Sequence, residues 1–181
     1  MIPIQQTTFG YAIAFISPGV VVLWALSKFS QEVRGWFGIA ANAEATVAGF
    51  LFVLLAAVAL GVFASGVRWA IVDNVLELFP STRQPDLDRT KLKDPDTLAS
   101  YNQMTELYYR YYQFYSNMLV ALIAAYVMWL CDLGLFPWQR PASLAGVAVV
   151  SVSLFASARD AWKRYYKHLR EILGVKGERG R

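Results

Sequence analysis

Charged residues, cysteine and histidine are all scarce in this 181-residue chain. Charged residues make up 17% of the sequence, whereas soluble domains carry about 25%. The single cysteine, Cys131, excludes an internal disulfide framework, and we expect it to be a small buried residue at the end of a helix. The single histidine, His168, lies in a basic stretch near the C-terminus, where we expect it to be solvated.

The missing charge is concentrated in four uncharged runs. They cover residues 1–27, 45–67, 111–131 and 141–158, with lengths of 27, 23, 21 and 18 residues. A helix needs about 20 apolar residues to cross a bilayer. The pattern excludes an ordinary soluble domain, a secreted disulfide scaffold and a disordered protein. It predicts an all-α polytopic membrane protein with four transmembrane helices, at about 9–27, 45–67, 111–131 and 141–158.

The basic residues predict the orientation of these spans. If the connecting segments alternate in side, one side carries three basic residues, which are Lys28, Arg34 and Arg140. The other side, formed by 68–110 and 159–181, carries the remaining 14. The positive-inside rule makes the second side cytoplasmic. We therefore expect both termini to be cytoplasmic, in an integral membrane protein of the bacterial plasma (inner) membrane.

Helical periodicity continues beyond three of the spans. Apolar residues keep helical spacing through about 68–79, 97–111 and 159–173, which predicts cytoplasmic extensions of the second, third and fourth helices. Residues 1–181 would then form one membrane domain, with a helical head from about 68–110 and 159–173 and a frayed tail at 174–181. We expect an N-cap at Asp96-Thr97, a C-cap at Gly174, and a polar loop without helical pattern at 80–96.

Small residues mark places where helices can approach closely. Ser17-Pro18-Gly19 predicts a kink within the first span, because proline lacks the backbone donor. In the second span Ala57, Gly61 and Ser65 are spaced four apart, a pattern that favours close packing against another helix of this chain or of another subunit. The fourth span is rich in Ala, Gly and Ser around Gly146, and we expect it to pack against neighbours rather than lipid.

Sequence motifs for catalysis are missing. There is no nucleophile elbow, no phosphate-binding glycine loop, no HExxH, and no set of His, Cys and carboxylates at metal-ligand spacing. The cores of the four spans also lack ionisable residues, which disfavours ion-coupled transport. We therefore expect no catalytic residues, no metal and no cofactor.

Polar residues do gather at the predicted cytoplasmic boundary, which makes this the candidate site for a ligand or a gate. One interpretation is a belt of ion pairs that holds the head to the spans, and the other is a polar pocket or gate. The candidate residues are Arg68, Asp73, Glu106, Arg110, Asn117, Arg159 and Asp160.

The tail predicts one partner, the membrane itself. Residues 159–181 carry eight basic and three acidic residues, and a basic juxtamembrane helix attracts anionic lipid headgroups. Because topology and lipid explain this charge, nucleic-acid binding is not needed. We also expect a homo-oligomer, a cytoplasmic protein partner, or both.

Three functional hypotheses remain open. The architecture is similar to that of small membrane components of bacterial multi-protein systems, including antiviral defence and stress response, which favours a non-enzymatic subunit that oligomerises or recruits a cytoplasmic partner. The second hypothesis is a homo-oligomeric channel or pore, for which Ser151, Ser153 and Ser157 are weak lining candidates. The third is a small lipid-acting enzyme, which predicts that Asp73, Glu106 or Asp160 is essential while the fold stays intact.

Overall fold

The computed structural model describes residues 10, 12–38, 46–79 and 85–174, and each regular element among them is helical. Three helices are long and apolar enough to cross a membrane: Val47–Glu77, Pro95–Asp132 and Pro141–Leu173. A fourth apolar helix, Ala12–Leu26, is shorter. These helices indicate a membrane protein. The predicted first span begins at residue 9, which lies outside the described residues. All of the predicted tail after Gly174 also lies outside them.

The first helix is irregular where the sequence predicts a kink. A π-helical turn, η1 (Ala12–Ile16), leads directly into the α-helix α2 (Ser17–Leu26). Pro18 occupies the first turn of α2, where its missing N–H leaves the carbonyl four residues earlier, that of Ala14, without its α-helical donor. After α2 the short helix α3 (Gln31–Trp36) follows, capped by the Ser30 hydroxyl, which accepts from the Val33 N–H.

The second long helix runs through three segments without a break. It comprises α4 (Val47–Arg68), the π-helical turn η2 (Trp69–Asp73) and α5 (Asn74–Glu77). Thr46 caps its start by accepting a hydrogen bond from the Gly49 N–H at 3.0 Å. The predicted continuation past Arg68 is present.

The third long helix begins earlier than the sequence analysis predicts. It comprises α6 (Pro95–Met104), the π-helical turn η5 (Thr105–Tyr109) and α7 (Arg110–Asp132). The predicted cap at Asp96-Thr97 is wrong: Asp94 is the N-cap, because its carboxylate accepts from the Thr97 N–H at 3.0 Å while Pro95 suits the first helical position. The loop before it also contains a 3₁₀ helix, η4 (Arg89–Lys93), which the sequence pattern did not predict.

The fourth long helix is uninterrupted. A short 3₁₀ turn, η6 (Pro137–Gln139), leads into α8 (Pro141–Leu173), which ends at the predicted C-cap Gly174. Gly174 has a φ of +71°, a conformation that glycine adopts without the steric cost other residues meet. Cys131, near the end of α7, is exposed and not buried as expected.

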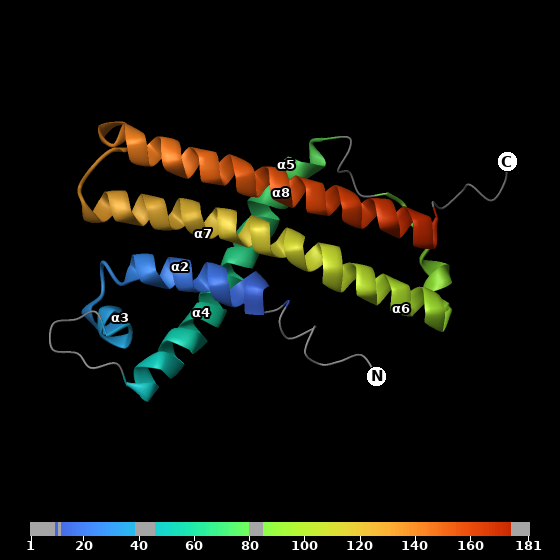
Figure 1. Cartoon of the computed structure of the whole chain (residues 1–181), viewed down its shortest axis with the longest axis horizontal. Coiled ribbons are helices and arrows are strands. Elements are labelled where there is room, and N and C mark those ends of the chain that lie inside the picture. The colour runs from blue at the N-terminus through green and yellow to red at the C-terminus, as the bar shows by residue number, and fades with distance from the viewer. Residues whose placement is uncertain (1–9, 11, 39–45, 80–84, 175–181) are drawn as a thin grey trace.

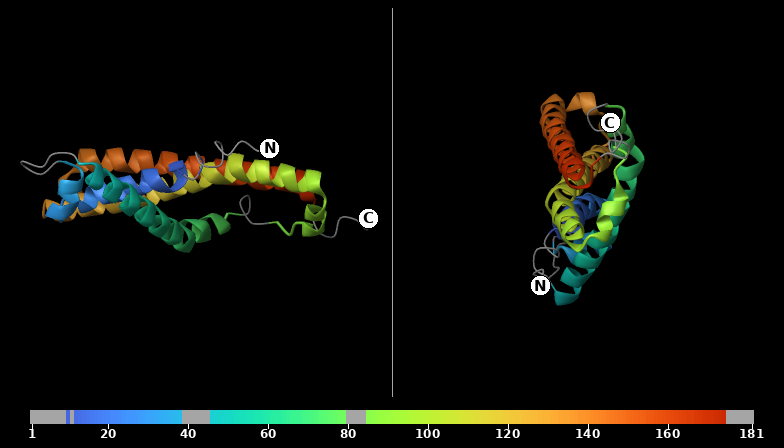
Figure 2. Two further views of the ribbon diagram at one scale, coloured as in Figure 1. Left: turned by 90° about the horizontal axis from the view of Figure 1, so that it is seen from below. Right: turned by 90° about the vertical axis from the view of Figure 1, so that its right-hand side faces the viewer.

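The helices form two sets that cross each other. Helices α7 and α8 run side by side along the long axis of the molecule, and α2 packs against α7 (Figure 1). The α4–α5 helix crosses these helices obliquely instead of running along them (Figure 2). Helix α2 therefore contacts both α4 and α7.

Two glycines allow α2 and α4 to touch backbone to backbone. A Cβ added to Gly61 would lie 1.9 Å from the Phe15 carbonyl oxygen, and one added to Gly19 would lie 1.7 Å from the Ala57 carbonyl oxygen. No side chain fits at either position without separating the helices. In the described structure the partner of the Ala57–Gly61 seam is thus the first helix of the same chain, and Ser65, one turn on, is only half-buried.

The exposed faces of α4 and α8 differ in composition. The exposed face of α4 carries large apolar side chains, among them Phe50, Leu55 and Phe63. In α8, only 6% of the most apolar window is buried, yet its exposed positions include many small residues. Helix α8 packs along α7, but Gly146 lies away from that contact, because a Cβ there meets nothing within 4 Å.

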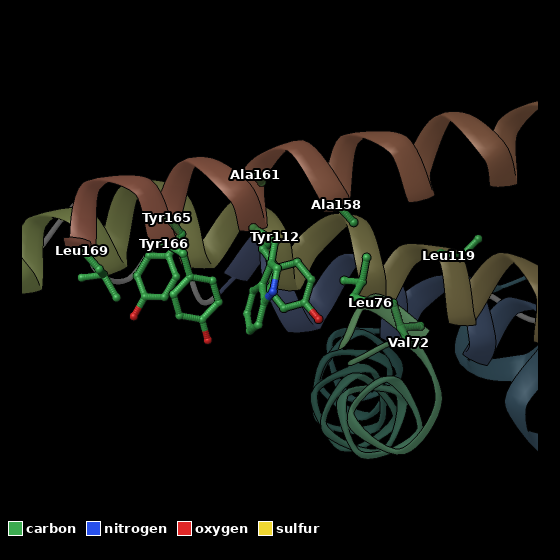
Figure 3. Close-up of a cluster of buried hydrophobic side chains, with 10 residues drawn as sticks. Val72, Leu76, Tyr112, Leu119, Ala158, Ala161, Tyr165, Tyr166 and Leu169 are labelled. Carbon is green, nitrogen blue, oxygen red and sulfur yellow. The ribbon is translucent and has the colours of Figure 1, made fainter. Parts of the chain in front are cut away.

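A cluster of aromatic and aliphatic side chains joins the three long helices. Val72 and Leu76 of the second helix pack with Tyr112 of α7 and with a stripe on α8 (Figure 3). The stripe comprises Ala158, Ala161, Trp162, Tyr165, Tyr166 and Leu169. Because residues on this stripe recur at helical spacing, one face of α8 contacts both other helices.

The crossing can be tested at Gly61. Gly61→Ala places a methyl group against the Phe15 backbone, so we expect it to lower the free energy of unfolding by about 3 kcal/mol. Gly66→Ala on the same helix is the matched control, because its Cβ meets nothing within 4 Å, and it should be neutral or stabilising by up to about 1 kcal/mol. Thermal unfolding of both variants in mild detergent measures the difference, and equal stability would contradict the close crossing.

Candidate functional site

The centre of the candidate site is a buried arginine. Arg68, at the end of α4, has only 4% of its surface exposed, and its Nε lies 3.9 Å from the Asp73 Oδ1 atom. The guanidinium carbon lies 5.2 Å from the centre of the Tyr112 ring, within cation–π distance. The Tyr112 hydroxyl in turn donates a hydrogen bond to Asp73 Oδ1. These three groups connect the second helix to α7.

The π-helical turn η2 explains why Arg68 and Asp73 meet. The two residues are five positions apart, and in an α-helix residues four apart share a face. A π turn has hydrogen bonds between residues five apart, so it brings residues at that spacing onto one side. The turn spans Trp69–Asp73, directly after Arg68. Sequence periodicity that assumes an α-helix does not predict this pair.

A second ion pair lies nearby on the third helix. Arg110 Nη2 lies 3.3 Å from Glu106 Oε1, and Arg110 Nη1 donates to the Gln113 side-chain oxygen at 2.7 Å. A Cβ at Gly10 would lie 3.3 Å from Arg110 Cγ, so the start of the first helix packs against this pair. Glu106 and Arg110 are four positions apart, the spacing at which opposite charges pair along a helix.

The Asn117 side chain hydrogen-bonds to the backbone of the first helix. Its Nδ2 donates to the Ala14 carbonyl oxygen at 2.8 Å, and the Asn117 side chain is fully buried. Ala14 is the residue whose carbonyl loses its α-helical donor to Pro18. Asn117 therefore satisfies a backbone group that the proline leaves open, which gives it a structural role at this position.

The remaining candidates lie apart from this centre. The Arg159 guanidinium carbon lies 5.0 Å from the Phe79 ring centre, which joins α8 to the end of the second helix. Asp160 is exposed and accepts from Arg164 Nε at 2.8 Å, so it belongs to the surface and not to the cluster. His168 is only half-solvated: it stacks on Tyr108 with ring centres 5.0 Å apart and lies 2.9 Å from Glu171.

A cleft of about 540 Å³ opens beside the Arg68–Asp73–Tyr112 contact, and we term it the aromatic cleft. Of the sequence candidates only Asp73 lines it. The aromatic lining residues lie within the predicted helical extensions, but their meeting depends on the helix crossing. The cleft is lined by Trp69, Asp73, Asn74, Glu77, Tyr101, Thr105, Tyr109, Trp162, Tyr165 and Tyr166.

The described residues that line the aromatic cleft do not form a set of metal ligands. No three His, Cys, Asp or Glu side chains gather there in a way that could hold a metal ion. No family model, curated protein or solved structure matches this chain. Function is therefore inferred from its own geometry.

The Arg68–Asp73 contact gives a direct test of the ion-paired belt. Asp73→Asn leaves the buried Arg68 charge without its carboxylate, so we expect a loss of about 3 kcal/mol in the free energy of unfolding. Asp160→Asn, which breaks an exposed pair, should cost less than about 1 kcal/mol. Unfolding in detergent measures both, and a fully stable Asp73→Asn protein would count against the belt.

Proposed function

We propose that this chain is a non-enzymatic integral membrane subunit that assembles with further copies of itself through the exposed face of α8. The observation that carries the proposal is the contrast between two exposed apolar faces of one molecule. On α4 the exposed positions are rich in Phe and Leu, as expected for contact with lipid chains. On α8 small residues make up more of the exposed positions, and the larger exposed side chains are one leucine and three valines with no phenylalanine. The small residues are Ala142, Ala145, Gly146, Ala148, Ser153 and Ala156, and the larger ones are Leu144, Val149, Val150 and Val152.

Small residues have a specific use in a membrane. Lipid chains are as apolar as leucine, so helices associate through close van der Waals packing, which small residues permit. Within the chain that packing occurs where Gly19 and Gly61 meet. The α8 face offers a second surface of the same kind, and a second copy presenting the same face would form a two-fold symmetric contact.

The proposed topology has four spans with both termini in the cytoplasm. The three long helices supply three spans, and Ala12–Leu26 with the residues before it supplies the first. This arrangement places 14 basic residues inside and three outside. The end of the molecule formed by α6, η5 and the last turns of α8 then projects into the cytoplasm, where the basic face of α8 meets anionic headgroups.

Assembly can be tested by replacing a glycine with leucine at two positions, one on α8 and one on α4. Gly146→Leu adds bulk to the proposed interface, and we expect it to weaken self-association at least tenfold, the scale of overpacking a close contact. Gly66→Leu is the control, because Gly66 is exposed on α4 and a Cβ there also meets nothing within 4 Å. Native mass spectrometry of the protein released from lipid nanodiscs gives the stoichiometry of each.

A monomeric wild-type protein, or equal stoichiometry for wild type and Gly146→Leu, would overturn the proposed assembly. A dimer that Gly146→Leu dissociates and Gly66→Leu does not would support it.

Topology can be tested by cysteine labelling in a Cys131→Ser background. Trp138 is 71% exposed in the turn before α8, and Ser100 is exposed on α6. We expect a membrane-impermeant maleimide to label Trp138→Cys on intact cells and Ser100→Cys only after permeabilisation. Labelling of Ser100→Cys on intact cells would contradict the proposed orientation.

A further inference from the structure

We propose that the aromatic cleft binds an organic ammonium group. The cleft lies between the end of the second helix, the turn η5 and α8, and is separate from the exposed face of α8 proposed for assembly. Its volume of about 540 Å³ falls within the range of about 300–1,000 Å³ typical of small-molecule sites.

Aromatic rings dominate the walls of the cleft, and several are in mutual contact. The Trp162 ring packs edge-on against Tyr166, with centres 4.7 Å apart and planes at 89°. Tyr109 lies 5.4 Å from Tyr165 and 6.2 Å from Trp162, between ring centres. Packed rings at several orientations form a concave aromatic wall. A cation near such rings is attracted to their faces, and groups of rings are the usual receptors for quaternary ammonium ions.

The charge of the cleft is negative. Asp73 and Glu77 line it, and among the residues that the structure describes no lysine or arginine does. Asp73 already interacts with Arg68 and Tyr112, so much of its charge is compensated. Glu77, one turn further along the same helix, is exposed and supplies the charge that a cation in the cleft would neutralise.

Hydrogen-bond acceptors complete the cleft. The side chains of Tyr165 and Tyr166 on α8 and of Tyr112 on α7 project to the same side of this helix pair (Figure 3). The Thr105 hydroxyl donates to the Tyr101 carbonyl oxygen, and the Tyr165 hydroxyl interacts with the side chains of Thr105 and Tyr101. A hydroxyl oxygen has two acceptor lone pairs, so this set retains acceptor capacity for a further donor. A primary ammonium can donate three hydrogen bonds, so both primary and quaternary ammonium groups suit this chemistry.

The position of the cleft is compatible with an ammonium group of a membrane lipid and with that of a soluble molecule. Its walls follow the uncharged runs that end before Arg68 and Arg159, so it opens where the proposed spans reach the headgroup layer. The ammonium can belong to an ethanolamine or choline headgroup of a phospholipid, or to a small soluble amine. The chemistry recognised is the same in both cases.

Binding of the free ion is measured first, with the full-length protein in detergent. Tetramethylammonium and ethanolammonium chlorides are titrated against intrinsic tryptophan fluorescence, since Trp69 and Trp162 line the cleft, with sodium chloride at equal ionic strength as the blank. We expect a saturable change with both ammonium ions. Glu77→Gln should weaken binding about fivefold, the effect of one nearby solvated charge, and Trp69→Ala about threefold.

The matched control is Asp132→Asn, which removes one exposed carboxylate at the far end of α7 and should bind as the wild type does. The lipid source is tested by native mass spectrometry from nanodiscs of equal phosphatidylethanolamine and phosphatidylglycerol. Preferential retention of phosphatidylethanolamine, reduced in Glu77→Gln, identifies a lipid headgroup as the ligand. Equal lipid retention together with ion binding identifies a soluble amine.

The proposal is overturned if neither ammonium ion differs from sodium, or if Glu77→Gln and Asp132→Asn bind equally. Both variants change exposed side chains, and their elution profiles show whether they fold. Because stoichiometry is not used as a readout here, failure of ammonium binding is distinguishable from failure of the proposed assembly.

Discussion

The backbone contact between the first helix and α4 sets the geometry of the whole molecule. Gly19 and Gly61 let the two helices touch without side chains between them, and α4 consequently crosses the α7–α8 pair at an angle. That angle carries the end of the second helix toward α7 and α8. The contacts of Arg68, Asp73 and Tyr112, and the cleft beside them, lie at the end of that path.

Irregular helical turns accompany each polar contact in this region. The turn η1 precedes Pro18 and contains Ala14, whose carbonyl Asn117 satisfies; η2 brings Arg68 and Asp73 together; and η5 contains Glu106, the partner of Arg110. A π turn adds one residue to a helical turn and is stable only where tertiary contacts compensate for its weaker backbone packing. Polar side chains of α7 supply such contacts to η1 through Asn117 and to η2 through Tyr112, whereas Glu106 of η5 pairs with Arg110 on its own helix. Each of these ion pairs lies within one helix. The contacts between helices are the hydrogen bond from Tyr112 to Asp73, the contact of Arg68 with the Tyr112 ring, and the hydrogen bond from Asn117 to Ala14.

Much of the fold was predictable from the sequence because helices are locally encoded. Charge-free runs located the long helices, Gly174 marked the end of the last one, and the small residues Ala57 and Gly61 marked a close contact. The boundaries that failed depend on single side chains: Asp94 caps the third helix because Pro95 follows it, although Asp96 and Thr97 have suitable chemistry. The candidate site was predicted only in part. Arg68 and Asp73 were both among the predicted candidates and lie in contact, although their pairing was not predicted, and Asp160 faces Arg164 on the surface.

The sequence by itself determined which segments are helical, which are apolar enough to enter a membrane, and where small residues permit close approach, since each is a property of one helix and its own side chains. The tertiary structure decided the partner of the Gly61 seam, the meeting of Tyr112 with Asp73, and the assembly of aromatic rings from three helices into one cleft. It also decided that the small-residue face of α8 stays uncovered. These features depend on the angle at which helices cross and on the rotation of each helix about its own axis. The hydropathy of a single helix determines neither its crossing angle nor its rotation.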